Sequence, residues 1–224
     1  MPLTIAMDGP VGAGKSTIAD AVAQRLNILH LDTGAMYRAI GVGVMDRGGD
    51  IYNEEEVCAL LEKELRVSVA YENGCQKTLL CGEDVSARIR TQEAGTAASA
   101  VSRYARVRKA MVALQQEIAK KQSILMDGRD IGTVVLPNAT VKIYLTASDE
   151  VRATRRMNQL REKGDQTPFE TILEEVRARD YQDMNREVTP LRRADDAILV
   201  DSSLLNFDET VRAILDIVEA HYAE

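Results

Sequence analysis

The stretch Leu3-Thr-Ile-Ala-Met-Asp-Gly-Pro-Val-Gly-Ala-Gly-Lys-Ser-Thr17 decides how the rest of the chain is interpreted. Its first six residues form a short apolar run that predicts a buried strand, and a helix is expected over residues 15–26. Between them, residues 9–16 match the pattern G-x-x-x-x-G-K-[ST]. Strand, glycine-rich loop and helix therefore follow one another in the order that a phosphate-binding loop requires.

This loop can hold a triphosphate because its glycines let consecutive backbone N–H groups turn toward phosphate oxygens, and the helix N-terminus adds further amides. Lys15 is expected to reach the β- and γ-phosphates, Ser16 to ligate Mg²⁺, largely through waters, and Thr17 to bond the α-phosphate. The alternative, a glycine-rich turn with a surface lysine, fits this strand–loop–helix context poorly. The predicted triphosphate-binding residues, to which the resemblance described below assigns ATP, are Gly9, Pro10, Val11, Gly12, Ala13, Gly14, Lys15, Ser16 and Thr17.

Strands and helices alternate outward from this loop. Such alternation predicts an α/β P-loop fold of three layers, with a five-stranded parallel sheet flanked by helices. Residues 63–88 differ, because their polar–apolar alternation and the Glu72-Asn-Gly74 turn predict a small antiparallel β insertion. The further strands are expected over 28–31, 123–127, 140–145 and 197–201, and the further helices over 34–47, 91–102, 104–121, 149–162, 168–184 and 208–220.

Composition bounds the class of protein. With 224 residues, 45% of them hydrophobic, the chain is expected to be one globular domain whose core is aliphatic, since aromatic residues make up only 4%. A net charge of −7 argues against a nucleic-acid partner. We find no membrane-spanning run and no signal-peptide pattern, so a cytoplasmic location is expected. The three cysteines predict reduced, buried thiols, although Cys75 and Cys81 could face each other across a hairpin.

Four polar clusters outside the loop are candidates for a second substrate site. Asp32 to Arg38 follow the second strand, and Asp127 to Asp130 follow a later one, where ligands of open parallel sheets bind. Arginine side chains match phosphate oxygens, so a phosphorylated acceptor, namely a nucleoside monophosphate, is indicated. The structural alternatives are helix caps, exposed helix faces and surface ion pairs. The other two clusters are Ser99 with Arg103, Arg106 and Arg108, and Arg179 with Asp183 and Arg186.

These motifs together resemble those of the bacterial cytidylate kinase family along essentially the whole chain. The resemblance rests on Asp8 to Thr17, Leu31 to Arg38, residues 82–86 with 89–92, Met126 to Thr133, and residues 179–180 with 185–186. It implies a single kinase domain over residues 1–224. The core would take about 1–33, 104–150 and 190–224, the monophosphate-binding region about 34–103, with the β insertion at about 63–88, and a helical lid about 151–189.

The resemblance also implies a reaction and residue roles. ATP would donate its γ-phosphoryl group to CMP or dCMP, with Mg²⁺ as cofactor and Asp127 as a further candidate for the metal. Arg38, Arg129 and Arg186 would hold the acceptor phosphate, Thr33, Arg108 and Asp130 would read cytosine, and Ser99, Arg179 and Asp183 would contact the sugar. Thr33 stands where many relatives carry serine, and Ser16 where some carry glycine. The implied catalytic residues are Lys15, Arg129, Arg155, Arg156 and Arg186.

A basic helix precedes the break at residues 164–168. Arg152, Arg155 and Arg156 share one face of it, which predicts lid arginines that meet the triphosphate, or else a solvated basic stripe. Two other functions stay open at this point. One is another small P-loop kinase, acting on UMP, shikimate or a similar acceptor, and the other is a nucleotide-binding switch or nucleic-acid-binding module. We expect a monomer, because nothing in the sequence resembles a coiled-coil seam.

Overall fold

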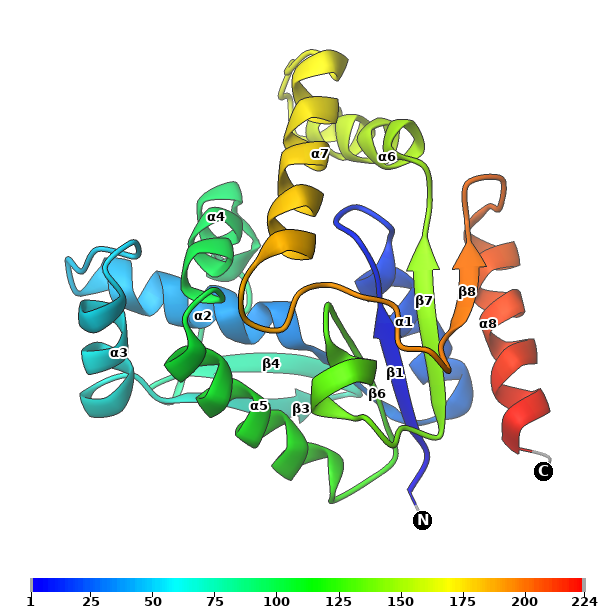
Figure 1. Cartoon of the computed structure of the whole chain (residues 1–224), viewed down its shortest axis with the longest axis horizontal. Helices are drawn as coiled ribbons and strands as arrows, with labels where there is room; N and C mark the ends of the chain where they lie inside the picture. The colour runs from blue at the N-terminus through cyan, green and yellow to red at the C-terminus, as the bar shows by residue number, and fades with distance from the viewer. Residues whose placement is uncertain (1, 223–224) are drawn as a thin grey trace. The chain divides into compact units, whose positions relative to one another are not determined.

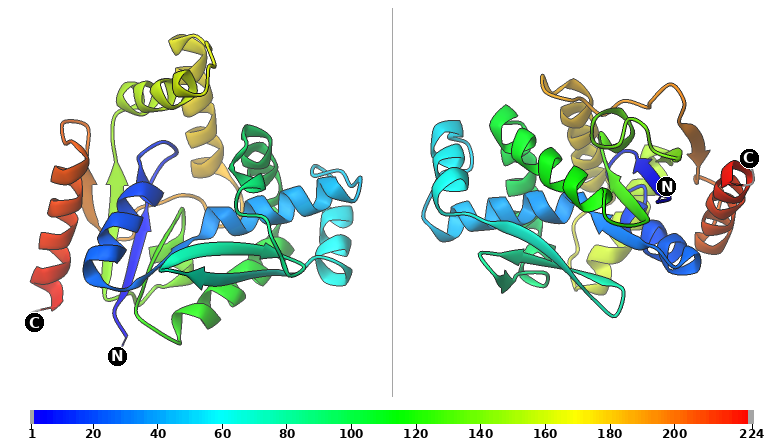
Figure 2. Two further views of the ribbon diagram at one scale, coloured as in Figure 1. Left: turned by 180° about the vertical axis from the view of Figure 1, so that it is seen from behind. Right: turned by 90° about the horizontal axis from the view of Figure 1, so that it is seen from below.

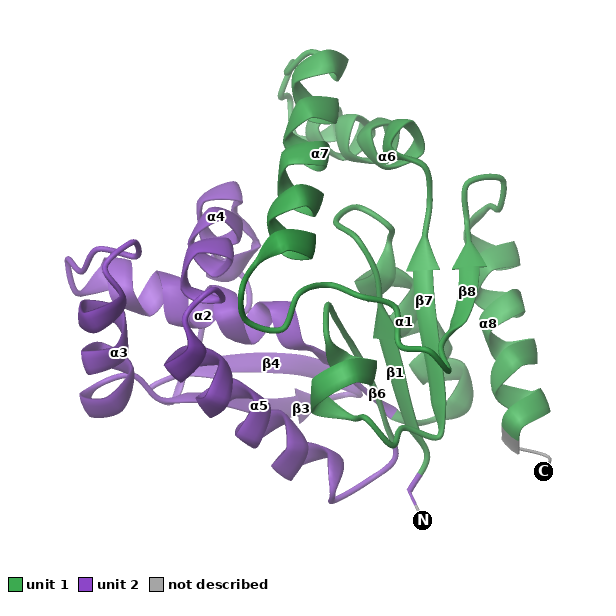
Figure 3. Ribbon diagram, viewed as in Figure 1, with its two compact units in different colours: residues 1, 3–28, 124–224 green, residues 2, 29–123 purple. Residues whose placement is uncertain are grey.

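The computed structural model describes residues 2–222, and contacts within the chain divide it into two compact units (Figure 3). Unit 1 contains residues 3–28 and the chain from residue 124 onward, and unit 2 contains residues 29–123. Among the described residues, no helix combines the length and the apolar character needed to cross a membrane.

The main sheet has five strands in the order β2-β6-β1-β7-β8, which confirms the predicted parallel sheet. β1 (Thr4–Asp8) is central, and it pairs in parallel with β6 (Ile124–Gly128) and β7 (Val141–Thr146). β8 (Ile198–Asp201) pairs with β7, and β2 (Leu29–Asp32) ends the order on the other side. Parallel strands end at a common edge, so the residues after β1 and β6 emerge side by side.

Two helices of unit 1 pack together beside this sheet, α1 (Lys15–Leu26) and α8 (Phe207–Tyr222) (Figures 1 and 2). Both helices have the amphipathic spacing that buries one face. Their buried face forms the core of the unit with apolar residues of β1 and β7. This core includes Ile5, Met7, Ile18, Val22, Ile143, Leu145, Val211, Ile214 and Val218.

A second helix pair in unit 1 is formed by α6 (Asp149–Glu162) and α7 (Phe169–Asn185) (Figure 1). The two helices pack through a small apolar core of their own. Between β6 and β7 the chain forms a five-residue π-helical turn, η2 (Ile131–Val135), which contacts β1. The residues of the α6–α7 core are Ala153, Leu160, Ile172 and Val176.

Unit 2 is built around α2 (Thr33–Asp46), which is buried along most of its length. Gly41 allows a close approach to α4, because a Cβ there would lie 2.5 Å from Cβ of Ala97. Gly43 does the same for the small sheet, because a Cβ there would lie 3.1 Å from a methyl carbon of Leu80, the last residue of the second strand of that sheet. The other elements are the antiparallel strands β3 (Val67–Glu72), β4 (Cys75–Leu80) and β5 (Glu83–Asp84), the helices α3 (Glu54–Lys63), α4 (Gln92–Val101) and α5 (Ala105–Ala119), and the short 3₁₀ turn η1 (Arg88–Arg90).

Three features of the fold differ from expectation. Helix α3 was not predicted from the sequence, although Asn53 caps it by accepting a hydrogen bond from the N–H of Glu56. Cys75 and Cys81 lie at and just beyond the two ends of β4, so they do not face each other, and Cys75 pairs with Glu72 instead. All three thiols are free, but of these only Cys58 is buried, so the prediction of burial was wrong for the other two.

Candidate active site

The phosphate loop joins β1 to α1 as predicted. Gly14 adopts φ of +86° directly before the helix, a left-handed conformation that glycine favours. Lys15 is 6% exposed, and its Nζ donates a hydrogen bond to the carbonyl oxygen of Pro10 at 2.8 Å. Burial, with a further contribution from the positive charge of Arg129, lowers the pKa of Lys15 from 10.5 to about 7. A bound polyphosphate would favour the charged form of this lysine.

Oxygen ligands for a divalent cation lie beside the loop. The hydroxyl of Ser16 donates a hydrogen bond to Oδ2 of Asp127 at 2.9 Å, and Asp127 is buried at the end of β6. Hydroxyl and carboxylate oxygens suit Mg²⁺, which keeps several waters and takes its remaining ligands from phosphates. Within residues 2–222, no cluster of three or more His, Cys, Asp or Glu side chains could cage a metal. The residues present therefore fit an ion that arrives with a triphosphate.

Arginine and carboxylate side chains from β6 and α7 meet next to this loop. Arg129, which follows β6, donates from Nε to Oδ2 of Asp183 at 2.7 Å, and Nε of Arg179 lies 4.0 Å from Oδ1 of the same carboxylate. Burial alone would raise the pKa of Asp183, but Arg129, Arg179 and Arg186 outweigh it and hold the pKa below its usual range. The structure thus brings Arg129, Arg179 and Asp183 together.

Arg186 and Asp130 form a second buried pair in unit 1. Nη2 of Arg186 lies 3.8 Å from Oδ1 of Asp130, and both side chains are at most 8% exposed. Nε of Arg186 donates to the carbonyl oxygen of Thr189 at 2.7 Å. Helix α7 ends at Asn185, so Arg186 is in extended backbone rather than on the helix face that its spacing from Arg179 and Asp183 had predicted.

Asp8 organises the turn that carries these residues, a role that sequence reasoning missed. Its two carboxylate oxygens accept hydrogen bonds from the N–H groups of Ile131 at 2.8 Å and Gly132 at 2.7 Å. Burial raises the pKa of Asp8 to about 6, although these two hydrogen bonds and Lys15 favour the charged form. The carboxylate therefore fixes the backbone immediately after Arg129 and Asp130. An acidic residue directly before a glycine-rich loop was the only signal of it in the sequence.

The remaining candidates lie in unit 2, mostly on buried helix faces. Thr33 is the first residue of α2 and is buried, and Asp32 caps that helix by accepting from the N–H of Ala35 at 3.0 Å. Arg38 donates from Nη1 to the carbonyl oxygen of Ile89 at 3.1 Å. Arg108 is 3% exposed, lies over the ring of Tyr37 at 5.6 Å and donates to the carbonyl oxygen of Ser102 at 3.2 Å.

Ser99 lies on α4 and is half-buried. Two of the three arginines in the same predicted cluster are exposed. Arg106 pairs with Glu55 and Glu62 at the surface, so the structural alternative holds for it, and Arg103 is likewise exposed. Only Arg108 of the three arginines is buried.

The three arginines of α6 have different environments. Arg152 is 3% exposed and bonded to groups of the protein, so it is neither a free lid residue nor part of a solvated stripe. Arg155 donates to the carbonyl oxygens of Ala13 at 3.4 Å and Ser202 at 2.8 Å. Arg156 is half-buried and close to Asp165, whose pKa is lowered by hydrogen bonds from Thr167 and, less, by Arg156.

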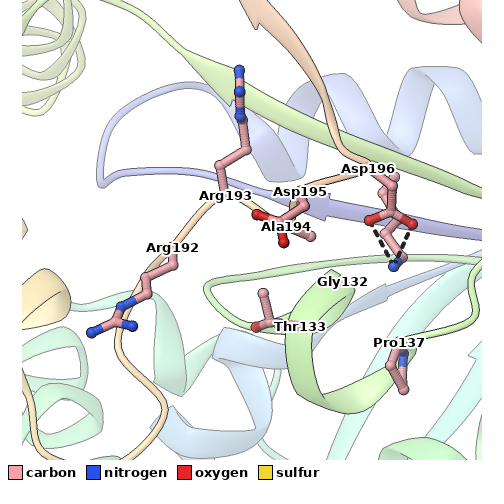
Figure 4. A pocket seen from close by; sticks show the side chains of 9 residues that line it. Gly132, Thr133, Pro137, Arg192, Arg193, Ala194, Asp195 and Asp196 are labelled. Atoms are coloured by element: carbon pink, nitrogen blue, oxygen red, sulfur yellow. Dashed lines mark hydrogen bonds and ion pairs between the residues drawn. The ribbon is translucent and has the colours of Figure 1, made fainter.

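A pocket of about 380 Å³ in unit 1 lies next to η2 but does not belong to this constellation (Figure 4). Lys142 is its buried cation, and it forms an ion pair with Asp196 at 2.7 Å. The side chains of Arg192 and Arg193 point in different directions (Figure 4). Because these two arginines diverge and Lys142 is paired with Asp196, the pocket contributes no residue to the proposed phosphate sites.

The parallel sheet carries a phosphate-binding loop with a buried lysine, and a hydroxyl–carboxylate pair and several arginines lie near that loop. These features define the class of protein, which is a P-loop nucleotide-binding fold with kinase architecture. Comparison of the sequence with protein families gives a match to the cytidylate kinase family over residues 5–220. The chain therefore belongs to the cytidylate kinase family.

Individual relatives agree with this assignment. The cytidylate kinase of Bacillus licheniformis is 46% identical over 217 residues, which are 97% of this chain and 96% of the relative. Cytidylate kinase 1 of Haemophilus influenzae is also 46% identical, over 97% of this chain and 94% of its own. The cytidylate kinase of Caldicellulosiruptor bescii is 44% identical, over 96% and 95%.

Solved structures support the fold at lower sequence identity. A gluconokinase from Sinorhizobium meliloti has a TM-score of 0.50 and 14% identity, covering 99% of this chain and 95% of its own. An uncharacterized protein from Eubacterium ventriosum has a TM-score of 0.51 and 13% identity, covering 98% and 99%. At this identity the likeness concerns the fold alone.

Proposed function

We propose that the chain transfers the γ-phosphoryl group of ATP to CMP or dCMP, which yields ADP and CDP or dCDP. The observation that carries this proposal is the match to the cytidylate kinase family over residues 5–220, which includes the phosphate loop and the candidate acceptor residues alike.

The proposed reaction is a direct in-line transfer. The attacking oxygen belongs to the phosphate of the acceptor and is anionic at neutral pH, so no strong general base is needed. Catalysis then consists of positioning and charge stabilisation. Lys15 would neutralise the β- and γ-phosphates, and Arg129, which lies near enough to lower the lysine pKa, would neutralise the transferred group.

Mg²⁺ is the proposed metal. Ser16 and Asp127 would hold it, partly through waters, because their oxygens already meet at 2.9 Å beside the loop. When bound, the ion neutralises charge on the triphosphate oxygens.

The acceptor is proposed to be recognised by the residues that the family resemblance implies. Arg38, Arg129 and Arg186 would hold its phosphate, and Ser99, Arg179 and Asp183 its sugar. Thr33, Arg108 and Asp130 would read the base. Asp130 suits cytosine because an ionised carboxylate accepts from the N4 amine, whereas uracil presents an oxygen at that position. The burial of Asp130 supports this role, since leaving a buried polar group unpaired makes discrimination steep.

The α6–α7 pair is proposed to be the lid. Arg155 and Arg156 would meet the triphosphate, and closure would exclude water that otherwise competes as nucleophile. The contact of Arg155 with the carbonyl oxygen of Ala13 supports its role at the phosphate loop. That the enzyme acts as a monomer stays a prediction.

A panel of acceptors assayed with ATP tests the proposal. CMP and dCMP should be phosphorylated at rates well above those for UMP, AMP and shikimate, with ADP formed in equal amount. A chain that prefers shikimate or UMP, or that binds nucleotide without transferring phosphate to any acceptor, would refute it.

Asp130→Ala tests the base-reading role within the same assay. The variant should lose CMP use far more than ATP binding, because of the two substrates only the acceptor is proposed to contact this carboxylate. An unchanged ratio of CMP to UMP activity would remove Asp130 from base recognition. Arg106→Ala, a change at the exposed surface, serves as the matched control.

A further inference from the structure

A buried ion pair links both helices of the α6–α7 pair. Arg152 on α6 is 3% exposed, and its Nη1 donates a hydrogen bond to Oδ2 of Asp180 on α7, which is 8% exposed. Arg152 was predicted with the lid arginines to meet the triphosphate, but it is buried against groups of the protein, and Asp180 is not among the proposed substrate contacts. A buried pair of this kind contributes little net stability, because desolvation of both charges offsets their attraction. Its presence calls for another explanation.

The pair holds the first turn of the phosphate loop by the main chain of Val11. Oδ1 of Asp180 accepts from the N–H of Val11 at 3.1 Å, and Nη1 of Arg152 donates to the carbonyl oxygen of Val11 at 2.8 Å. The side chain of Val11 also packs against the apolar core shared by α6 and α7. One residue of the loop is thus attached to the helix pair through its amide, its carbonyl and its side chain.

Further bonds fix the guanidinium of Arg152. Nε donates to the carbonyl oxygen of Ala147 at 2.9 Å, and Nη2 donates to Oδ1 of Asp149 at the start of α6. The next loop residue, Gly12, adopts φ of +75°, and a Cβ there would lie 3.3 Å from Cβ of Arg152. The backbone of α6 therefore lies directly against the loop, and the arginine is hydrogen-bonded at all three of its guanidinium nitrogens.

We propose that Arg152 and Asp180 are positioning residues for phosphoryl transfer: they set the direction of the amides in residues 11–14 and couple the phosphate loop to α6 and α7. This inference rests on the proposed function, in which that loop holds ATP. Because coupling between sites is reciprocal, nucleotide at the loop stabilises the docked arrangement of the two helices, and loosening the pair weakens nucleotide binding. The acceptor does not contact this pair, so its binding should change little.

Asp180→Asn and Arg152→Lys test the proposal. Asparagine keeps the shape but loses the charge, and its amide nitrogen cannot accept at the position where one of the two carboxylate oxygens accepts now. Lysine keeps the charge but cannot bond Ala147, Val11, Asp149 and Asp180 together. Charge-assisted hydrogen bonds are each worth about 1.5–3 kcal/mol, so either variant should raise the Kd for ADP and the KM for ATP by about tenfold or more. The KM for CMP should stay within about twofold.

Arg177→Ala is the matched control, because Arg177 joins the same two helices through exposed ion pairs with Asp149 and Glu150. This variant should change the Kd for ADP and the KM for ATP and for CMP by no more than about twofold. Calorimetric titration of the protein with ADP measures nucleotide binding at the loop without phosphoryl transfer, so it separates this inference from the proposed reaction. Tight ADP binding by a wild-type chain that phosphorylates no acceptor would refute the reaction and leave the inference testable.

The result that overturns the inference is a lower melting temperature with an unchanged Kd for ADP and an unchanged kcat, because a purely structural pair would behave in that way. Equal losses for ATP and CMP would overturn it too. Should Asp180→Asn fail to fold, Arg152→Lys decides: a weaker affinity for ADP alone supports the inference, and an unchanged affinity contradicts it.

Discussion

Two arginines of unit 1, Arg129 and Arg152, have carboxylate partners, whereas Arg38 and Arg108 of unit 2 donate to carbonyl oxygens. In unit 1, Arg129 bonds Asp183 and Arg152 bonds Asp180, so buried guanidinium groups are matched by buried carboxylates. In unit 2, Arg38 donates to the neutral carbonyl of Ile89, and Arg108 lies over the ring of Tyr37 and donates to the carbonyl of Ser102. Carbonyl groups orient an arginine without cancelling its charge.

This difference has a functional meaning under the proposed reaction. Carboxylate partners in unit 1 fix the geometry of groups around the phosphate loop, which must be in place before the transferred charge develops. The positive charge of Arg38 in unit 2 remains available for an anionic acceptor. Removing Lys15 in unit 1 should therefore reduce catalysis, and removing Arg38 in unit 2 should reduce acceptor binding.

The largest effect expected is that of Lys15→Ala in unit 1. Removing the buried ammonium group takes away charge stabilisation at the phosphates, so kcat should fall by at least about 10³-fold. The measurement is steady-state ADP production by the purified variant, with circular dichroism and melting temperature as controls of folding. Near-normal turnover would contradict the assignment of the phosphate loop.

Arg38→Ala tests the role proposed for Arg38 of unit 2. Loss of one charged hydrogen-bond donor to the acceptor phosphate should raise the KM for CMP by about 10–100-fold and leave the KM for ATP within about twofold. Arg106→Ala, which removes exposed ion pairs with Glu55 and Glu62 in the same unit, is the control and should change neither constant. Equal effects on both substrates would contradict the assignment of Arg38 to the acceptor.

Asp8→Asn tests a residue of unit 1 that is expected to act on the acceptor. The amide can accept from Ile131 or Gly132 but not from both, so the turn carrying Asp130 should loosen, the KM for CMP should rise about tenfold and discrimination against UMP should fall. An unchanged CMP-to-UMP ratio in this variant would limit Asp8 to a structural role.

The pH dependence of this effect follows from the pKa of Asp8, which burial raises to about 6 while Asp130 and Lys15 also act on it. Below that pH the protonated carboxyl loses an acceptor position, so the KM for CMP of the wild type should rise as the pH falls through 6. The Asn variant should lack this rise. A parallel rise in both proteins would assign the titration to another group.

The smallest expected effect is a proton taken up when ATP binds. Lys15, with its pKa lowered to about 7, is mostly neutral at pH 8.5, and the phosphates should restore its charge. Calorimetry in two buffers of different ionisation enthalpy should detect uptake of about one proton at pH 8.5 and much less at pH 6. Lys15→Arg, which stays charged, should take up none; the same uptake in that variant would exclude Lys15 as the source.

The sequence was sufficient for features that depend on neighbouring residues. The phosphate loop and helix α1 were predicted from one continuous stretch, and their bounds are confirmed at Lys15–Leu26. The parallel sheet followed from apolar runs separated by helical patterns, because buried parallel strands need no partner information to be recognised. Helix α3 was missed although Asn53 and the glutamates after it form an N-terminal cap signal.

Contacts between distant residues could not be predicted in the same way. Helical spacing placed Arg152, Arg155 and Arg156 on one face of α6, but it carries no information about what packs against that face. Asp180 and the phosphate loop pack against that face at Arg152, so this arginine is buried, contrary to expectation. The hydrogen bonds from Ile131 and Gly132 to Asp8 span 123 and 124 positions of the sequence, and neither isoleucine nor glycine indicates such a partner.

The glycines of the phosphate loop have unequal tolerance to mutation, although they look alike in the motif. A Cβ on Gly9 would lie 2.0 Å from the carbonyl oxygen of Leu145 in β7, so any side chain there would force two central strands apart. A Cβ on Gly14 meets nothing nearer than 4.0 Å, and only its backbone angle opposes substitution. Asparagine, which accepts left-handed backbone more readily than other residues, is therefore conceivable at position 14, whereas position 9 admits glycine alone.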